Sequence, residues 1–560
     1  MSLLRLAVRS ATYYWRTNLA VLLGVAAAVA VLGGALLVGD SVRGSLRDIA
    51  LGRLGRADQA LSSAQFFREA VADTLASSGR TAPLIVSSGF VTHEPSGRRA
   101  GSVVIYGVDE RFWTFHGVQP PDGPAISPAL ASELGAQKDD VLLVRLQRPS
   151  EIPVESLFGR KEEIGRTIRL TLSEVLTRDR MGEFALRPQQ TELRAVFAPL
   201  RRVQRDLGVQ GQVNTILMAG TSDDAAAADA REALTLEDLG LSVRPSADGA
   251  HVIVDSTSGI LSQPVEDGIR VVARALSLDP IPVFTYLANT MRVGDRAIPY
   301  SLIAAVPLRV LRTPDPAPRT PGADSLVLNE WAARELRAKP GDTLEIEYYR
   351  WDANAGLTTH TASFTVLKIA PIAGFAADRG LAPEYPGITG ADSLADWDPP
   401  FPIDLSRVRD EDEQYWDDYR TTPKAFIQYE RGRELWETRY GAVTSIRFPV
   451  PEGTRADDLA SRLSTELRSA LRPEAVGVAV LPVRRLATEA SVGATDFGEY
   501  FTYFSFFIVV SAILLAILFF RLGVEGRLRQ IGIMRAAGFT VSAIRRVMLI
   551  EAVALAAVGG

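Results

Sequence analysis

Two long apolar runs dominate the pattern of hydrophobic and polar positions along this chain, at residues 19–38 and 501–520. Each run contains 20 residues and no charged side chain. An α-helix rises about 1.5 Å per residue, so a helix of this length crosses the hydrocarbon layer of a bilayer, which is about 30 Å thick. Aromatic residues cluster at both ends of the second run, as they do at membrane interfaces (Tyr500, Phe501, Phe519 and Phe520). The pattern predicts two transmembrane helices.

The first run has a competing interpretation as a cleaved signal peptide, because Arg5, Arg9 and Arg16 precede it. Signal peptides have apolar cores of only about 7–15 residues, so the length of the run favours an uncleaved anchor. A third apolar stretch begins near residue 547 and reaches the last residue, 560. We expect residues 547–560 to start a third transmembrane helix and the sequence to be part of a longer protein.

Arginines lie on one side of both runs. Three arginines and no acidic residue precede the first run, whereas Asp40 and Asp48 follow it. Residues 521–546 carry six arginines against a single acidic residue, Glu525. Because segments rich in Lys and Arg stay in the cytoplasm, the pattern predicts that residues 1–18 and 521–546 are cytoplasmic and that residues 39–500 lie outside.

The long region between the two runs alternates strand-like and helix-like patterns. Strand-like alternation occurs at residues 102–107, 250–255 and 363–369, and residues 456–471 form an amphipathic helical pattern. Proline-rich stretches at residues 119–124, 312–321 and 397–402 are typical of loops or joints between subdomains. The fold class predicted for residues 39–500 is α+β, inserted between transmembrane α-helices.

An internal repeat emerges when residues 126–146 are aligned without gaps on residues 328–348. Six of the 21 positions are identical: Ala131/Ala333, Glu133/Glu335, Leu134/Leu336, Ala136/Ala338, Asp140/Asp342 and Leu142/Leu344. Each copy has the pattern of a short amphipathic helix, a turn that ends in Asp, and a strand. This predicts two related helix–strand subdomains, although chance matches in a chain rich in Ala and Leu are the alternative.

The composition and the absence of known motifs exclude several classes of function. The chain has 560 residues, a net charge of −5 and no cysteine, so no positive field favours nucleic acid, and thiolate chemistry is excluded. It contains no phosphate-binding GxxxxGK[ST] loop, no HExxH and no GxSxG. Four histidines lie far apart in the sequence (His93, His116, His251 and His360), and the acidic segment 404–418 is more typical of a solvated loop than of a cation site. We predict no catalytic residue, no metal and no cofactor.

The segment 523–551 holds the most informative pattern. Residues 524–537 are compatible with one helix, Gly538 can adopt the left-handed conformation that ends it, and Thr540 can cap the next helix. Ile531 and Met534 are three residues apart and share a helix face. Arg527 and Arg535 can reach phosphate headgroups or an acidic partner. The alternative is a generic basic amphipathic loop.

Residues 525–552 read E-x-R-x-R-Q-I-G-I-M-R-A-A-G-F-T-x-x-x-I-R-R-x-x-L-I-E-A, which resembles the cytoplasmic segment of the FtsX-like, MacB-type family of ABC transporter permeases. That family usually has Glu where this chain has Gln530, and Leu where it has Ala537. Residues 327–344 and 422–446 also resemble the extracytoplasmic domain of the family. The order of parts is similar as well: a helix, a large outer domain, and a helix followed by this segment.

The resemblance implies a coupling helix that docks into a separate cytoplasmic ABC ATPase dimer, formed by residues 530–538 and including Gln530, Ile531, Gly532, Met534, Arg535, Ala537 and Gly538. ATP-driven motion would pass through the membrane helices to the outer domain, a mechanism called mechanotransmission. The implied protein is a permease subunit of the bacterial cytoplasmic membrane, not an enzyme, which pairs as a homo- or heterodimer. Its substrate would be a lipoprotein, a peptide or a drug.

Two other classes of function compete with this one. A membrane-anchored extracytoplasmic sensor or receptor would need a cytoplasmic signalling helix after the second run, but a third apolar run begins about 26 residues later. A membrane-anchored enzyme or adhesion domain gives no reason for the motif at residues 525–552.

Overall fold

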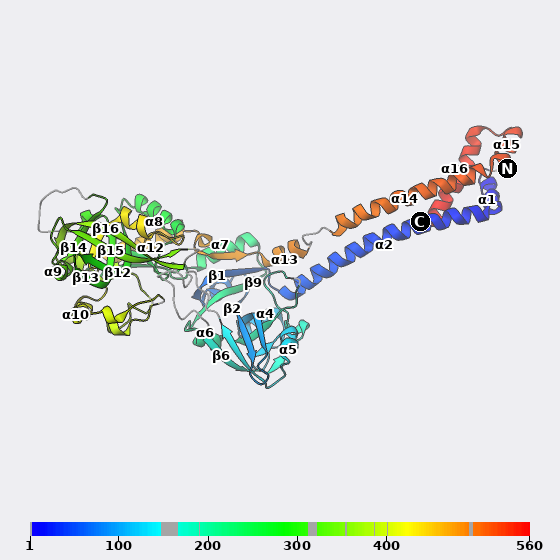
Figure 1. Cartoon of the computed structure of the whole chain (residues 1–560). Coiled ribbons are helices and arrows are strands. Elements are labelled where there is room, and N and C mark those ends of the chain that lie inside the picture. The colour runs from blue at the N-terminus through cyan, green and yellow to red at the C-terminus, as the bar shows by residue number, and fades with distance from the viewer. Residues whose placement is uncertain are drawn as a thin grey trace. The chain divides into compact units, whose positions relative to one another are not determined.

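The structure, a computed structural model, describes residues 3–146, 166–189, 191–311, 322–352, 356–385, 387–399, 401–491 and 497–559. The proline-rich stretch at 312–321 therefore lies outside the described residues. The chain divides into two compact units. A helical unit comprises residues 1–55, 185–190 and 483–560, and an α+β unit comprises residues 56–184 and 191–482 (Figure 1).

The helical unit is built from long antiparallel helices. Its helices are α1 (Leu3–Tyr13), α2 (Trp15–Leu54), α13 (Val483–Ser491), α14 (Phe497–Glu525), α15 (Leu528–Ala536) and α16 (Val541–Gly559). α14 runs beside α2, and α16 packs against both α1 and α2 (Figure 1). α2 is 40 residues long and therefore extends well beyond the predicted span at residues 19–38 on its C-terminal side.

The two predicted spans both lie inside single continuous helices, α2 and α14. Within the described residues, one stretch, Phe506–Glu525, has the length and hydropathy that a membrane crossing requires. Its side chains Phe507, Leu514 and Ile517 are more than half exposed. Apolar surface of this extent is unfavourable in water. The number of spans and their boundaries stay predictions.

The first sheet of the α+β unit has the path β19-β1-β9-β2-β3-β8-β4-β7, and β5 and β6 extend it beside β2. Its strands are β1 (Gln59–Arg68), β2 (Arg80–His93), β3 (Arg99–Val108), β4 (Ala125–Ile126), β5 (Val141–Leu146), β6 (Arg166–Thr171), β7 (Glu174–Val175), β8 (Ala195–Pro199), β9 (Gln212–Ala219) and β19 (Val478–Leu481). The helices of this part are α3 (Val71–Leu75), α4 (Glu110–His116), α5 (Pro128–Leu134), α6 (Leu200–Leu207) and α7 (Asp223–Ala233).

The second sheet has the order β10-β11-β18-β12-β13-β17-β14-β16-β15, with a further pairing of β12 with β15. Its strands are β10 (Leu241–Pro245), β11 (His251–Ser256), β12 (Ile281–Val293), β13 (Arg296–Val306), β14 (Ser325–Asn329), β15 (Thr343–Asp352), β16 (Gly356–Ala370), β17 (Ala425–Gln428) and β18 (Ser445–Pro449). Its helices are α8 (Gln263–Ala275), α9 (Glu330–Leu336), α10 (Asp410–Tyr419), α11 (Tyr429–Trp436) and α12 (Ala456–Ala470). The α+β class is confirmed.

The two sheets share a topology. The path β9-β2-β3-β8-β4 of the first corresponds to β18-β12-β13-β17-β14 of the second. β2 and β3 form an antiparallel pair, as β12 and β13 do. β3 then pairs in parallel with β8, as β13 does with β17. The prediction of two related helix–strand subdomains is confirmed by this correspondence.

The aspartate that both repeats contain closes the same turn. The backbone N–H of Gln137 donates to Oδ2 of Asp140 over 2.7 Å. At the aligned positions, the N–H of Lys339 donates to Oδ2 of Asp342, also over 2.7 Å. In both copies, the turn joins the short helix to the following strand, so the repeated Asp has a local structural role and needs no ligand to explain it.

The second subdomain carries an insertion between β16 and β17 that includes α10 (Figure 1). Residues 410–418 of the acidic segment 404–418 lie in this helix, so the prediction of a solvated loop is wrong for that part. The carboxylate of Asp412 is buried, 2.9 Å from Nε of Arg409 and 3.8 Å from Nζ of Lys424. Burial lowers the pKa of Lys424 to about 8, and the rings of Trp331 and Tyr415 lie 4.8 and 4.9 Å from its Nζ.

Candidate functional site

The turn after α14 positions the predicted coupling helix. α14 ends at Glu525, the chain turns at Gly526 and Arg527, and α15 begins at Leu528. The prediction of one helix over residues 524–537 is therefore wrong at its start. The physical reason lies in Arg527, whose side chain is buried within the helical unit and fixes the turn at this point.

The end of α15 follows the predicted signals. Gly538 has a φ of +88°, which is the left-handed region that favours glycine. The N–H of Phe539 donates to the C=O of Met534 over 3.0 Å and satisfies a carbonyl at the end of the helix. Oγ1 of Thr540 accepts the N–H of Ala543 over 3.3 Å, and α16 begins at Val541. Both predicted caps are confirmed.

No residue of α15 is fully buried, so part of the helix surface is open to a partner. Of the residues that the sequence singled out, Gln530, Ile531 and Met534 are half-buried, whereas Gly532, Arg535, Ala537 and Gly538 are exposed. Ile531 and Met534 thus share a face, and that face is partly covered. The exposed large apolar side chains of α15 are Leu528 and Ile533, at 62% and 63% exposure.

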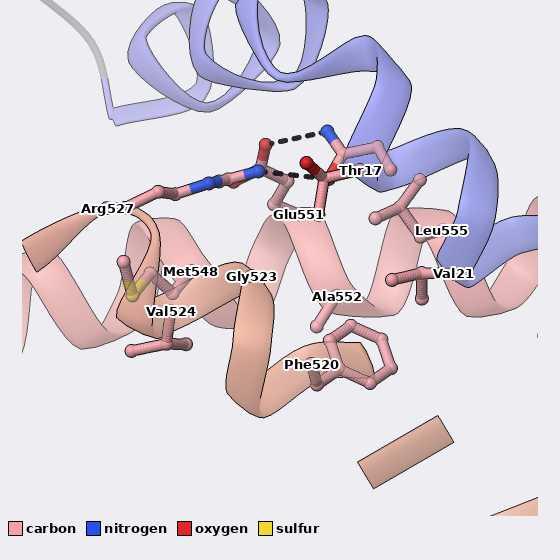
Figure 2. A pocket seen from close by; sticks show the side chains of 11 residues that line it. Thr17, Val21, Phe520, Gly523, Val524, Arg527, Met548, Glu551, Ala552 and Leu555 are labelled. Carbon is pink, nitrogen blue, oxygen red and sulfur yellow. Dashed lines mark hydrogen bonds and ion pairs between the residues drawn. The ribbon is translucent and has the colours of Figure 1, made fainter. Parts of the chain in front are cut away.

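A buried polar cluster anchors the root of α15. Arg527 donates from Nη1 to Oε2 of Glu551 over 2.5 Å and from Nη2 to Oδ1 of Asn18 over 2.9 Å. Asn18 in turn donates to Oε1 of Glu551 over 3.2 Å, and Oγ of Ser10 lies 3.3 Å from Nη1. The guanidinium sits 4.2 Å from the centre of the Tyr14 ring. Figure 2 shows Arg527, from the turn before α15, and Glu551, from α16, pointing toward one another.

The cluster joins four segments of the helical unit: α1, α2, the turn before α15, and α16. Arg527 and Glu551 are each only 6% exposed. A buried ion pair is tolerated only when its geometry is good and further hydrogen bonds satisfy both partners. Asn18 and Ser10 supply such bonds to the two terminal nitrogens of Arg527, and Asn18 also bonds to Glu551, whereas Nε of Arg527 has no hydrogen-bond partner among the described residues. The cluster therefore fixes the start of α15 relative to α2 and α16.

A small cavity lies next to the cluster (Figure 2). Its volume is about 40 Å³, and Val21, Phe520, Met548 and Leu555 supply much of its apolar lining. A space of this size holds a water molecule or two but no organic ligand. The arrangement is thus suited to positioning helices and not to binding a substrate.

Sequence reasoning allowed an acidic partner for Arg527 but did not identify it as Glu551. The sequence did contain a signal for this pairing, because Glu551 lies inside an apolar run. Burying a carboxylate in such a run is unfavourable in free energy unless a cation pairs with it. Nothing in the sequence indicated that Asn18, Ser10 and Tyr14 also contact Arg527. They come from the other end of the sequence.

The four histidines are dispersed in the fold, and no group of three or more His, Asp or Glu side chains in the described ranges could hold a metal ion. His116 is buried in α4 against the rings of Phe112 and Phe184, and its Nδ1 accepts the N–H of Arg56 over 3.3 Å. Burial, together with the charge of Arg56, lowers the pKa of His116 to about 3.

This burial predicts an acid sensitivity. Below its ordinary pKa of 6.5, His116 takes up a proton in the unfolded chain but stays neutral in the folded one until about pH 3. The free energy of unfolding should therefore fall as the pH drops through this window, by roughly 3 kcal/mol at about pH 4. Chemical unfolding at several pH values should show a shallower acid slope for His116→Leu than for the wild type. An unchanged slope, or an equal change for the exposed His360→Leu, would contradict this assignment.

Comparison with known protein families gives a match for the C-terminal part of the chain. Residues 502–560 match the family model of the FtsX-like permease C-terminal domain. A comparison with curated proteins finds no significant match. The FtsX-like resemblance of residues 525–552 is thereby confirmed for this part of the chain.

Two solved structures are similar at low identity. One is the extracellular domain of the noncanonic ABC-type transporter YknZ from Gram-positive bacteria, with 10% identity, a TM-score of 0.22, and coverage of 31% of this chain and 91% of that chain. The other is the periplasmic region of MacB from Actinobacillus actinomycetemcomitans, with 10% identity and a TM-score of 0.23. The similarity covers 42% of this chain and 85% of that chain.

Proposed function

We propose that this chain is a permease subunit of an ABC transporter, in which α15 docks into a cytoplasmic ATPase and the helical unit passes the resulting motion to the α+β unit. The observation that carries the proposal is the match of residues 502–560 to the FtsX-like permease C-terminal domain. ATP hydrolysis is assigned to a separate subunit. The chain would lie in the bacterial cytoplasmic membrane and pair with a second permease as a homo- or heterodimer.

The surface of α15 supports the docking step. The helix lies between two apolar helices, α14 and α16, and exposes Leu528 and Ile533 together with Arg529 and Arg535. Exposed aliphatic side chains flanked by cations suit a protein groove with an acidic rim. We assign the main apolar contacts to Leu528 and Ile533, because the face with Ile531 and Met534 is already partly covered.

The polar cluster and α2 support the transmission step. Asn18 lies near the start of α2 and contacts Arg527 at the root of α15. From Asn18, α2 continues as one helix to Leu54, just before the first residue of the α+β unit, Arg56. This length corresponds to roughly 55 Å of unbroken helix. A displacement of α15 would therefore reach the far end of α2 through a rigid element.

The sensor or receptor alternative is not favoured, because the family match covers the segment after the second apolar run, where a receptor would carry its signalling helix. Lipoprotein, peptide and drug substrates all stay compatible with the proposal. One labelling experiment tests the membrane orientation that the proposal requires.

The chain contains no cysteine, so single cysteines can report which side of the membrane a residue occupies. Ser469→Cys in α12 and Ser542→Cys in α16 both change exposed positions. In spheroplasts, a membrane-impermeant maleimide should label Ser469→Cys and should label Ser542→Cys only after lysis. Labelling of Ser542→Cys in intact spheroplasts would refute the orientation.

A further inference from the structure

The α+β unit contains a second and much larger cavity, of about 470 Å³, which the proposed function does not use. Its lining combines residues of β1 with residues of β10, of the loop before α8 and of the segment 475–477. It thus lies where the two subdomains meet. Small-molecule sites have volumes of roughly 300–1,000 Å³ and occur preferentially at such junctions.

One wall of this cavity is aliphatic. Leu239, Leu241, Ile260, Leu261 and Val265 line it, and all five side chains are buried. None of them carries a polar group that would need a partner, so the wall suits a flexible hydrocarbon body. Of the described residues in the lining, Tyr440 alone is aromatic.

The rim of the cavity formed by Arg439 and Tyr440 is polar. Among the residues that the structure describes, Arg439 is the one charged side chain that lines the cavity. Its Nη2 donates to the hydroxyl of Tyr440 over 2.5 Å, and its guanidinium lies 4.9 Å from the centre of that ring. In the described part of the chain, Arg439 forms no ion pair with a carboxylate.

The backbone holds this rim in place. The N–H of Leu261 donates to the C=O of Val443 over 2.8 Å. Gly441 lies so close to the loop that a Cβ at this position would come within 2.2 Å of the carbonyl oxygen of Leu261. Only glycine permits this approach. Arg439 and Tyr440 are therefore presented at the cavity by a turn that packs directly against the aliphatic wall.

We propose that this cavity binds an aliphatic carboxylate, with its hydrocarbon chain on the wall of Leu239, Leu241 and Ile260 and its carboxylate at Arg439. A single guanidinium without a counter-charge selects an anionic head, and a charge-assisted hydrogen bond fixes it. The scarcity of aromatic side chains argues against a stacked ring as the ligand body. The binding needs no nucleotide and no ATPase, so its outcome is independent of the transport role.

The probe for the test is decanoic acid that carries a diazirine near the end of its chain, offered to the full chain in lipid nanodiscs. After irradiation, mass spectrometry should place the label in residues 239–265. Free decanoate should compete with the label, and decan-1-ol should compete about tenfold less well, because it lacks the charge that Arg439 binds. Equal competition by the alcohol, or no enrichment of label in residues 239–265, would overturn the proposal.

Two variants sharpen the result. Arg439→Gln should weaken competition by decanoate about tenfold and leave decan-1-ol unchanged, whereas Arg455→Gln, at an exposed arginine outside the cavity, should change neither. Ala475→Trp places a bulky side chain at the exposed edge of the lining and should abolish the labelling. Equal affinities of Arg439→Gln and Arg455→Gln, or undiminished labelling of Ala475→Trp, would contradict the site.

Discussion

Replacing Arg527 by methionine should destabilise the helical unit by about 3–5 kcal/mol, because it would leave the carboxylate of Glu551 buried without a cationic partner. Asn18 would remain as a hydrogen-bond donor to Glu551, but an amide does not neutralise the charge. Because Arg527 also fixes the turn before α15, the loss should be accompanied by weaker coupling to the ATPase. Thermal unfolding of the purified chain in detergent, followed by tryptophan fluorescence, measures the loss of stability.

The control for this variant is Arg545→Met, which removes an exposed arginine of α16 and should leave the unfolding temperature unchanged. Adding Glu551→Leu to Arg527→Met should recover most of the lost stability, because neither charge is then buried. An unfolding temperature of Arg527→Met equal to that of the wild type would contradict the stabilising role of the cluster. The same holds if the double variant were no more stable than the single one.

The features that the sequence predicted correctly are local ones. Gly538 and Thr540 end one helix and start the next through bonds to residues within five positions. Asp140 and Asp342 close equivalent turns by accepting an N–H from three residues earlier. Such signals survive in the sequence because the partners are neighbours in the chain. The repeat could be recognised for the same reason.

The features that the sequence missed depend on distant partners. The helix break before α15 is set by contacts of Arg527 with Asn18 and Ser10, which lie 509 and 517 positions away in the sequence. Periodicity correctly put Ile531 and Met534 on one face, but it could not show that the unit itself partly covers that face. Likewise, nothing near Asp412 in the sequence pointed to its burial beside Lys424.

Replacing Ile533 by aspartate should weaken the binding of the ATPase on the order of 100-fold. The substitution removes an exposed aliphatic side chain and puts a charge where the partner would have to bury it, which costs about 3 kcal/mol. The helical unit should not be destabilised, because Ile533 is exposed in α15 and makes little contact with the rest of the chain. A thermal melt beside the binding assay separates the two effects.

The docking of α15 is the central claim, and the most direct measurement is the affinity of the nanodisc-embedded chain for the ATPase that co-purifies with it. Val175→Asp is the matched control, since it makes the same type of change at an exposed position of β7 in the α+β unit. The account predicts that Ile533→Asp loses ATPase binding and stimulation of ATP hydrolysis, while Val175→Asp retains both. Wild-type affinity and stimulation in a folded Ile533→Asp variant would contradict it.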